Sequence, residues 1–266
     1  MSVESAPTFE SVSFPGVNGT TLAGTLDVPD GGARAWALFC HGFTLGKNSA
    51  AASRISKALA AHGIGVLRYD AAGLGGSSGN WEDGSFSTKV ADVHSAAAFM
   101  AGSGRPVSLL IGHSLGGAAV LAAAGGVDGL KAVVTVAAPF RPSHVLHLFE
   151  SELDRIALEG SAPVDLGGGE REIRRHLIED LQSHDLTESI HNLHLPLLVM
   201  HSPTDNTVGI DNASEIFSAA RHPRNFISLE GSDHLMVERA QTGRAAAIIA
   251  AWAGTYLDLD GSGQPD

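Results

Sequence analysis

The pentapeptide Gly112-His-Ser-Leu-Gly116 constrains the fold of this chain more than any other feature. The preceding residues 106–111 are mostly apolar and are typical of a buried strand, and the following residues 117–124 are small and favour a helix. A G-x-S-x-G sequence between a strand and a helix is the pattern of a sharp turn that exposes the serine hydroxyl above a sheet. Gly112 and Gly116 carry no Cβ, which leaves room for this turn. The pattern predicts a nucleophilic Ser114. A Gly-rich turn whose serine only caps the helix is the alternative.

Short apolar runs alternate with helix-forming stretches along most of the chain. Continuous apolar strands separated by helices are typical of a parallel sheet with helices on both faces. We therefore expect an α/β fold with a mostly parallel, doubly wound sheet. Asn18-Gly19, between the first two runs, favours a hairpin. The expected strands are 9–14, 22–28, 36–40, 65–69, 107–111, 133–137, 197–200 and 226–229, and the expected helices are 49–62, 86–100, 115–124, 212–220 and 242–256.

One segment, residues 141–192, interrupts this alternation without a strong strand signal. We interpret it as a small helical cap inserted after the sixth strand, over the active-site face. Residues 1–140 and 193–258 would form the core, and 259–266 a tail or linker. A helical excursion that touches no substrate is the alternative. The apolar residues at helical spacing are Val145, Phe149, Leu153 and Ile156 before the glycines 167–169, and Ile173, Leu177 and Leu181 after them.

Composition excludes several classes of protein. The 266 residues are 44% hydrophobic with a net charge of −12, which indicates a globular chain and argues against a nucleic-acid or anionic-membrane partner. The one cysteine, Cys40, cannot form an intramolecular disulfide, and its apolar surroundings suggest a buried small side chain. We find no signal peptide and no apolar run of the roughly 20 residues that span a bilayer. The sequence therefore predicts a cytoplasmic protein.

A serine hydroxyl needs a base and an orienting carboxylate before it becomes a good nucleophile. Asp205 follows the expected strand 197–200, and His234 follows the last expected strand. The carboxyl ends of parallel strands meet at one edge of the sheet, so we expect both side chains near Ser114. Asp211 also follows strand 197–200, but a helix start explains it, and Asp233 is adjacent to His234 and is better suited to holding the loop.

Two backbone N–H groups are needed to bind the negatively charged oxygen that forms during attack on a carbonyl. The residue after the nucleophile, Leu115, supplies one by position. We assign the second to Phe43, because His41-Gly42-Phe43 follows the early strand 36–40 and Gly42 allows the backbone to turn toward a substrate. An ordinary turn at the end of the strand is the alternative reading.

The sequence gives little support to a metal or a cofactor, and we expect none. His184, His191 and His194 lie close together, but no cysteine or regular ligand spacing accompanies them. Residues 258–263 match the first six positions of a calcium-binding loop, but the glutamate expected at position twelve is missing.

The chain resembles the α/β-hydrolase superfamily over nearly its whole length. The resemblance rests on His41-Gly42-Phe43, the turn at Ser114, Asp205, Asp233-His234 and Asp70-Ala-Ala-Gly-Leu-Gly-Gly-Ser77. Residues 41–48 and 196–208 also look like the hydrolase half of bacterial proteins that fuse an α/β hydrolase to an OsmC-type domain. This resemblance implies a carboxylic ester hydrolase, and a C-terminal OsmC-type domain in a longer parent protein. Short-chain and feruloyl-type esterases share such an HGF loop and a small cap.

Together these observations predict a serine carboxylesterase that acts on small esters with short-chain acyl or aryl groups. Ser114, Asp205 and His234 would be catalytic, and the amides of Phe43 and Leu115 would form the oxyanion hole. An acyltransferase, a feruloyl-type esterase with the same triad, and a non-catalytic ligand-binding scaffold are the alternatives. A homodimer is left open. From apolar spacing we expect the substrate pocket to be lined by Phe140, Leu146, Phe149 and Leu177.

Overall fold

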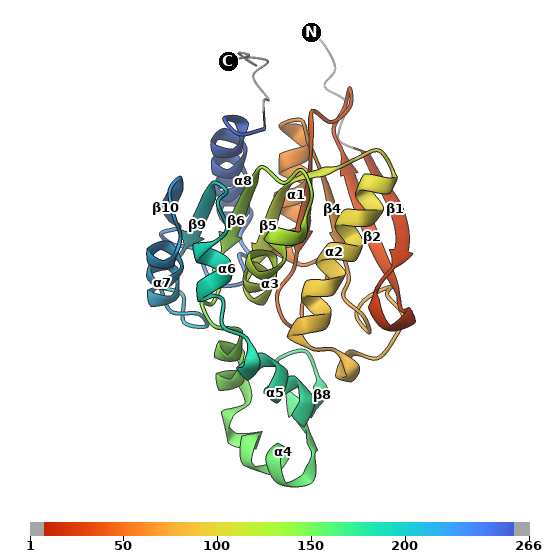
Figure 1. Ribbon diagram of the computed structural model, residues 1–266, viewed down its shortest axis with the longest axis vertical. Coiled ribbons are helices and arrows are strands. Elements are labelled where there is room, and N and C mark those ends of the chain that lie inside the picture. The colour runs from red at the N-terminus through yellow and green to blue at the C-terminus, as the bar shows by residue number, and fades with distance from the viewer. Residues whose placement is uncertain (1–7, 258–266) are drawn as a thin grey trace.

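Eight strands form one twisted sheet in the order β1-β2-β4-β3-β5-β6-β9-β10 in the computed structural model, which describes residues 8–257 (Figure 1). From β4 to β10 in this order the six strands are mutually parallel, and β2 runs antiparallel to both of its neighbours, β1 and β4. The expected α/β fold with a mostly parallel sheet is therefore confirmed. The strand bounds are β1 Thr8–Pro15, β2 Thr21–Val28, β3 Ala35–Cys40, β4 Ile64–Tyr69, β5 Val107–His113, β6 Ala132–Val136, β9 Leu197–His201 and β10 Arg224–Ser228.

The N-terminal hairpin forms as the sequence predicts. Strands β1 and β2 pair antiparallel from Thr8 opposite Val28 to Pro15 opposite Thr21. The connection contains Asn18 with φ 56° and Gly19 with φ 73°, both in the left-handed region that asparagine and glycine adopt most readily. Beyond the hairpin, β2 joins the rest of the sheet through β4.

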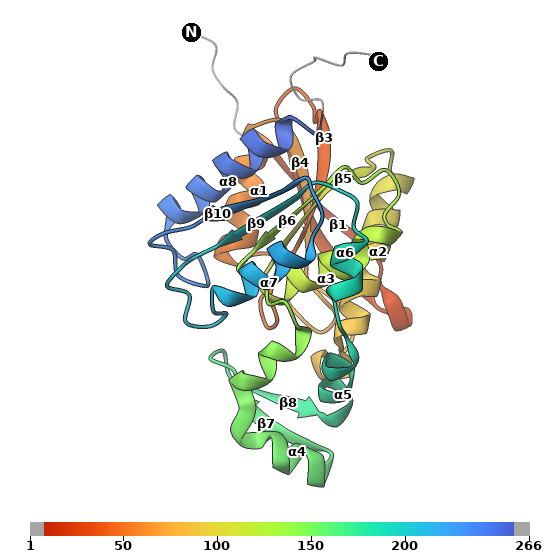
Figure 2. The same ribbon diagram turned by 60° about the vertical axis from the view of Figure 1, so that its left-hand side comes forward.

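Helices cover both faces of the sheet (Figures 1 and 2). Helices α1 and α8 pack together on one face, where their alanine and isoleucine side chains meet the buried β-branched and aliphatic residues of the central strands. Helices α2, α3 and α7 contribute to the larger apolar cluster on the other face. Because both faces are covered, strands β4, β6 and β9 are buried along their whole length. The helix bounds are α1 Ala50–Ala61, α2 Phe86–Gly102, α3 Leu115–Ala123, α7 Asp211–Ala219 and α8 Arg239–Gly254.

The segment between β6 and β9 extends beyond the core at one end of the molecule (Figure 2). It contains helices, as expected, but also an antiparallel hairpin that the sequence pattern does not predict. Ile173 belongs to this hairpin, so the helix expected around Ile173, Leu177 and Leu181 is wrong at its first residue. The elements are a 3₁₀ segment Pro142–Glu152, α4 Leu153–Glu159, β7 Ser161–Asp165, β8 Glu170–Arg174, α5 Arg175–Ser183 and α6 Thr187–His191.

The missed hairpin has a simple cause. Strands β7 and β8 are only five residues long, and most of their side chains are polar and face outward, so they lack the apolar run of the central strands. The glycines 167–169, expected to separate two helices, form the turn between the strands, and Gly167 and Gly169 have φ of 82° and 104°. Ala162 and Ile173, paired across the hairpin, are buried. The division into core and cap remains a prediction.

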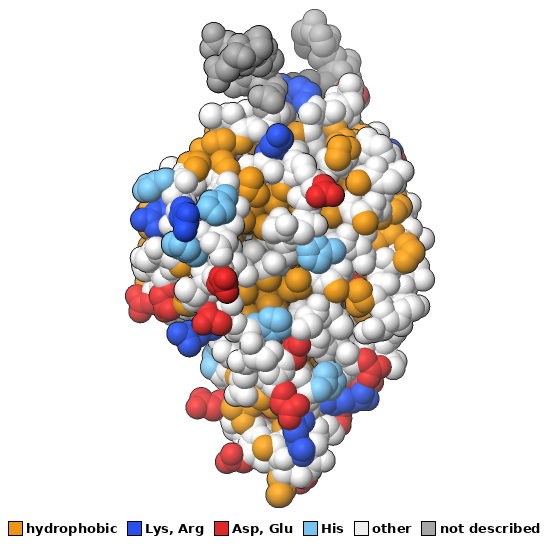
Figure 3. Space-filling view, viewed as in Figure 1, with side chains coloured by type: hydrophobic (Ala, Val, Ile, Leu, Met, Phe, Trp, Pro, Cys, Tyr) orange, Lys and Arg blue, Asp and Glu red, His pale blue; other side chains and the backbone are white. Residues whose placement is uncertain are grey.

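The expected tail 259–266 and the calcium-loop-like residues 258–263 lie outside the described residues. Within residues 8–257, no helix is both long enough and apolar enough to cross a membrane. The space-filling view shows charged side chains of both signs close together around the end formed by the segment between β6 and β9 (Figure 3).

Candidate active site

Ser114 lies at the sharp turn between β5 and α3. Its backbone has φ 54° and ψ −129°, a conformation that residues with a side chain rarely adopt. A Cβ on Gly112 would lie 2.3 Å from the carbonyl oxygen of Gly116, and a Cβ on Gly116 would lie 2.2 Å from the carbonyl oxygen of Cys40. Both glycines are therefore required for the close packing of the turn, as the sequence pattern predicts.

The structure brings Ser114, Asp205 and His234 together. Nε2 of His234 lies 3.0 Å from Oγ of Ser114, and Nδ1 of His234 lies 2.8 Å from Oδ2 of Asp205. A carboxylate only accepts hydrogen bonds, so Nδ1 carries the proton of the neutral imidazole. Nε2 is then the free acceptor that faces the serine hydroxyl. His234 and Asp205 lie in the loops that follow β10 and β9, at the carboxyl edge of the sheet.

Asp205 is held in its ionised form and in one orientation. Its Oδ1 accepts hydrogen bonds from the backbone N–H groups of Thr207 and Val208, each at 2.9 Å. Burial alone would raise the pKa of Asp205, but the hydrogen bonds from His234, Val208 and Thr207 outweigh it and lower the pKa below the usual value. The carboxylate therefore stays available to the imidazole near neutral pH.

The two competing carboxyl groups lie elsewhere. Asp211 is the first residue of α7, where Ile210 occupies the N-cap position, so the capping role considered from sequence is not observed. Asp233 accepts a hydrogen bond from the backbone N–H of Val237 at 3.4 Å, which helps to hold the loop that carries His234.

The loop after β3 lies directly beside the nucleophile. A Cβ built on Gly42 would lie 3.2 Å from Cβ of Ser114. The carbonyl oxygen of Gly42 accepts hydrogen bonds from Nδ1 of His41 at 2.8 Å and from Nζ of Lys89 at 3.5 Å. In a trans peptide bond the N–H points away from the preceding carbonyl oxygen, so these two donors fix the direction of the Phe43 N–H. Leu115 begins α3, and the first N–H groups of a helix have no acceptor within it.

His41 is buried, and its protonation is determined by its partners. Nε2 accepts the backbone N–H of Ala71 at 3.1 Å, so the proton resides on Nδ1 and is donated to Gly42. Burial, with the nearby charge of Lys89, lowers the pKa of His41 well below the usual value and keeps the ring neutral.

Asp70 connects the loop after β3 with the loop after β4. Its buried carboxylate accepts the backbone N–H of Lys47 at 2.8 Å and that of Gly76 at 3.0 Å, and it pairs with the Lys47 ammonium. Arg68 donates to the carbonyl oxygen of Lys47 at 2.8 Å while pairing with Asp27. These contacts hold the loop around Phe43 in place before any substrate binds, which is what an oxyanion hole requires.

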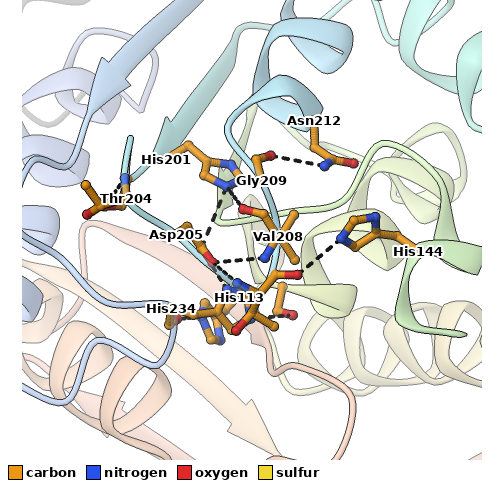
Figure 4. A network of polar contacts seen from close by, with 12 residues as sticks. His113, His144, His201, Thr204, Asp205, Val208, Gly209, Asn212 and His234 are labelled. Carbon is orange, nitrogen blue, oxygen red and sulfur yellow. Dashed lines mark hydrogen bonds and ion pairs between the residues drawn. The ribbon is translucent and has the colours of Figure 1, made fainter. Parts of the chain in front are cut away.

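Further histidines surround the triad, and the sequence reading did not identify them as part of the site (Figure 4). His113 contacts the backbone carbonyl of His234 at 2.7 Å, and His201 contacts that of Val208 at 2.7 Å. Nε2 of His201 also lies 3.7 Å from Oδ2 of Asp205. Burial lowers the pKa of His113 to about 4 and lowers that of His201, so both rings are neutral donors. The position of His113 directly before Ser114, inside the pentapeptide, is the one sequence signal that it belongs to the site.

Two cavities adjoin this site. The Ser114 cavity has a volume of about 690 Å³ and the Lys89 cavity a volume of about 490 Å³, both counted with the open space at their mouths. Phe43 borders both. The Ser114 cavity is lined by Phe43, Thr44, Leu45, Ser114, His144, Val145, His147, Leu148, Leu166, Thr207, Val208, His234 and Leu235. The Lys89 cavity is lined by Phe43, Ala71, Ala72, Trp81, Gly84, Ser85, Phe86, Thr88, Lys89, Asp92, Leu115 and Leu177.

Of the four expected pocket residues, one lines either of these two cavities. Leu177 lines the Lys89 cavity. Phe140, Leu146 and Phe149 are buried in the larger apolar cluster and are not among the residues that line these two cavities, so their place in the substrate pocket stays a prediction. Apolar periodicity identifies the face of an element that packs on the core, whereas a substrate cavity is bordered by the side chains next to that face. His144 and His147, from the same 3₁₀ segment, line the Ser114 cavity.

No group of three or more His, Cys, Asp or Glu side chains suited to a metal ion occurs among residues 8–257. The contact between Oγ of Ser114 and Nε2 of His234 is suited to proton transfer between the two side chains.

Comparisons with known proteins identify the family of the chain. Residues 37–247 match the sequence profile of the alpha/beta hydrolase family. The esterase domain of a Rhodothermus marinus protein is 40% identical, with 94% of this chain and 99% of that chain covered at a TM-score of 0.76. Est1E from Butyrivibrio proteoclasticus, solved with ferulic acid, is 17% identical, with 93% and 99% covered at a TM-score of 0.77. Mouse alpha/beta hydrolase domain-containing protein 10 is 19% identical, with 92% and 99% covered at a TM-score of 0.77. No curated protein sequence matches the chain.

Proposed function

The chain belongs to the alpha/beta hydrolase family, and on that basis we propose that it is a serine carboxylesterase. Its substrates would be small esters with short-chain acyl or aryl groups, and the reaction would proceed through an acyl-enzyme. The observation that carries this proposal is the continuous chain of hydrogen bonds from Ser114 through His234 to Asp205. The esterase domain that is 40% identical supports the same class of reaction.

In the first step Oγ of Ser114 attacks the ester carbonyl carbon while Nε2 of His234 takes the hydroxyl proton. The negative charge of Asp205 stabilises the imidazolium that results. The carbonyl oxygen gains the electron pair of the broken π bond and accepts hydrogen bonds from the N–H groups of Phe43 and Leu115. Loss of one such donor typically lowers kcat by about a hundredfold to a thousandfold.

The tetrahedral intermediate then collapses. The bond between the carbonyl carbon and the alcohol oxygen breaks, and the alcohol leaves with the proton held by His234. In the second half of the reaction a water molecule gives a proton to His234 and attacks the acyl-enzyme. Ser114 leaves as the hydroxyl with that proton, and the carboxylic acid is released.

Kinetics of Ser114→Ala test the proposal. We expect the purified chain to hydrolyse p-nitrophenyl butyrate and Ser114→Ala to lose this activity by at least about a thousandfold. Ser13→Ala, on the exposed side of β1, is the matched control and should retain full activity. Retained activity in Ser114→Ala would exclude Ser114 as the nucleophile.

A fluorophosphonate probe separates an enzyme from a non-catalytic scaffold. We expect a single adduct on Ser114, identified by peptide mass spectrometry, and none in Ser114→Ala. A folded wild-type chain that neither reacts with the probe nor hydrolyses any ester would favour a ligand-binding scaffold. Analysis of products with added alcohols or amines would reveal acyl transfer to an acceptor other than water.

A further inference from the structure

The Lys89 cavity carries two buried charged groups that the proposed reaction does not use. Lys89 is 8% exposed and Asp92 is 2% exposed, and both lie on α2 and line this cavity. Among the described residues, the Lys89 ammonium has one hydrogen-bond acceptor, the carbonyl oxygen of Gly42 at 3.5 Å. The Asp92 carboxyl accepts one hydrogen bond, from the backbone N–H of Val17 at 3.3 Å. Both groups therefore have unused hydrogen-bonding capacity facing a cavity.

The position of this cavity identifies which part of an ester could enter it; this step rests on the proposed function. The leaving alcohol must receive its proton from Nε2 of His234, and His234 lines the Ser114 cavity. The alcohol part of the ester therefore belongs in the Ser114 cavity. The Lys89 cavity borders Phe43 and Leu115, the two predicted oxyanion donors, but not His234. The acyl part would then extend from the proposed oxyanion hole into the Lys89 cavity.

The other walls of the Lys89 cavity are mainly apolar. Phe43 and Trp81 pack with their ring centres 5.4 Å apart, and Phe86, Leu115 and Leu177 add further apolar surface. The polar side chains of Ser85 and Thr88 also line the cavity, and each accepts the backbone N–H of the other residue. Such walls favour an apolar or aromatic acyl chain. Lys89 contacts the carbonyl of Gly42, which belongs to the same peptide bond as the Phe43 N–H. The Lys89 ammonium would thus lie within about 9 Å of the ester carbonyl oxygen, and a substrate group that binds it within about 12 Å.

The chemistry of Lys89 and Asp92 limits which substrate group can bind beside them. A purely apolar acyl end would leave an ammonium and a carboxyl desolvated without new partners, which is costly. A carboxylate end would gain from Lys89 but would be repelled by Asp92. A neutral hydroxyl can accept a hydrogen bond from Lys89 and donate one to Asp92.

We propose that the Lys89 cavity is the acyl-binding site and that Lys89 and Asp92 select an acyl group carrying a hydroxyl at the end away from the ester. Lys89 and Asp92 are specificity-determining residues in this proposal and take no part in bond breaking.

Hydrolysis of a matched pair of esters by the wild-type chain tests the proposal without any substitution. Ethyl 4-hydroxyphenylacetate and ethyl phenylacetate share their alcohol and differ by one hydroxyl on the acyl group. We expect kcat/KM to be at least about tenfold higher for the hydroxylated ester, because a site built to bind a hydroxyl discriminates against the analogue that lacks it. With the hydroxyl on the alcohol instead, 2-(4-hydroxyphenyl)ethyl acetate and 2-phenylethyl acetate should differ by less than about threefold.

The variant Lys89→Met tests whether Lys89 is responsible for the preference for the hydroxylated ester. We expect the ratio of kcat/KM between the two phenylacetate esters to fall to within about twofold of one. Loss of the Gly42 contact affects both esters equally, so the ratio isolates the contact with the hydroxyl. Lys57→Met, on the exposed face of α1, is the matched control and should keep the wild-type ratio.

Three results would overturn the proposal. A wild-type ratio near one, with Ser114-dependent hydrolysis of both phenylacetates, would reject the hydroxyl preference and leave the esterase proposal intact. If the enzyme instead prefers the acetate ester whose alcohol carries the hydroxyl, the alcohol part occupies the Lys89 cavity. The assignment of the acyl group to that cavity would then be wrong. If no ester is hydrolysed and the fluorophosphonate does not react, the proposed function fails first, and this proposal fails with it.

Discussion

His113 donates its Nε2 proton to the backbone carbonyl oxygen of His234 across 2.7 Å. A carbonyl oxygen only accepts hydrogen bonds, so the tautomer of His113 follows from this contact. The bond connects the residue directly before the nucleophile with the loop that carries the base. The distance between Ser114 and His234 is therefore stabilised by a contact that lies outside the three proposed catalytic side chains.

Replacement of His113 by Phe should lower activity without abolishing it. The phenyl ring fills much of the space but cannot hold the carbonyl of His234, so the base loses part of its alignment. We expect kcat for p-nitrophenyl butyrate to fall about tenfold to a hundredfold with KM nearly unchanged. His113→Gln, which can still donate through its amide, should recover part of this loss.

Equal activity of His113→Phe and wild type, with both folded by circular dichroism, would show that this contact is dispensable. A rise in KM with kcat unchanged would instead indicate a role in substrate binding.

The convergence of Ser114, Asp205 and His234 could be predicted from sequence because the local sequence around each residue identifies it. Ser114 lies in a pentapeptide between a strand and a helix, and Asp205 and His234 follow identifiable strands in the expected order. The supporting residues could not be found this way. His41 and His113 lie at the ends of apolar strands, where a histidine looks like an ordinary core residue. Their roles depend on carbonyl groups that only the folded chain brings near, those of Gly42 and His234.

The segment between β6 and β9 shows a second limit of sequence reading. The four-residue spacing of Ile173 and Leu177 looks helical, but the first residue is the buried position of a short strand and the second belongs to α5. A strand that runs directly into a helix can produce this spacing by chance. Phe140 and Phe149 show the same difficulty, because a large apolar side chain fits a pocket wall and a buried core equally well, and both residues pack in the larger apolar cluster.

Gly42→Ala should damage catalysis more than folding. The added methyl group would lie 3.2 Å from Cβ of Ser114 and 3.1 Å from Cδ1 of Leu45, closer than most real contacts. The loop must shift to relieve this crowding, which moves the Phe43 N–H that is proposed to bind the oxyanion. We expect kcat to fall by about tenfold to a hundredfold.

The matched control is Gly243→Ala in α8, where an added methyl group meets no atom within 4 Å. It should leave kcat unchanged. If Gly42→Ala retains full kcat, the loop after β3 does not supply the second oxyanion donor.

Acid should destabilise the protein through its buried histidines. The pKa of His113 is lowered to about 4 by burial, and those of His41 and His201 are also lowered. An unfolded chain, with histidine pKa values near 6.5, binds more protons than the folded chain between about pH 6.5 and 4. The stabilisation is therefore complete above pH 6.5 and is lost as pH falls toward 4. For His113 alone it amounts to about 3 kcal/mol.

Urea unfolding of wild type and His113→Phe at pH 7.5, 5.5 and 4.5 measures this contribution. The free energy of unfolding should fall less steeply with acid in the variant, because one buried titrating group is gone. Parallel pH dependence in the two proteins would contradict the assignment to His113.

Asp92 should have the opposite effect on the pH dependence of stability. Burial raises its pKa to about 6, so the folded chain binds more protons here than the unfolded chain between about pH 4 and 6. The stability that this group contributes is present at low pH and is lost as pH rises through 6, when an ionised carboxylate must remain buried beside the Lys89 cavity. Asp92→Asn removes that charge, and its side-chain oxygen can still accept the Val17 N–H. We expect the variant to be more stable than wild type at pH 8, by up to about 3 kcal/mol.

The gain should fade by pH 4, where wild-type Asp92 is neutral, and Asp128→Asn, at an exposed position, should show neither effect. A gain in urea unfolding free energy that is equal at pH 8 and pH 4 would reflect packing rather than charge, and a loss at pH 8 would mean that the ionised carboxylate contributes to stability.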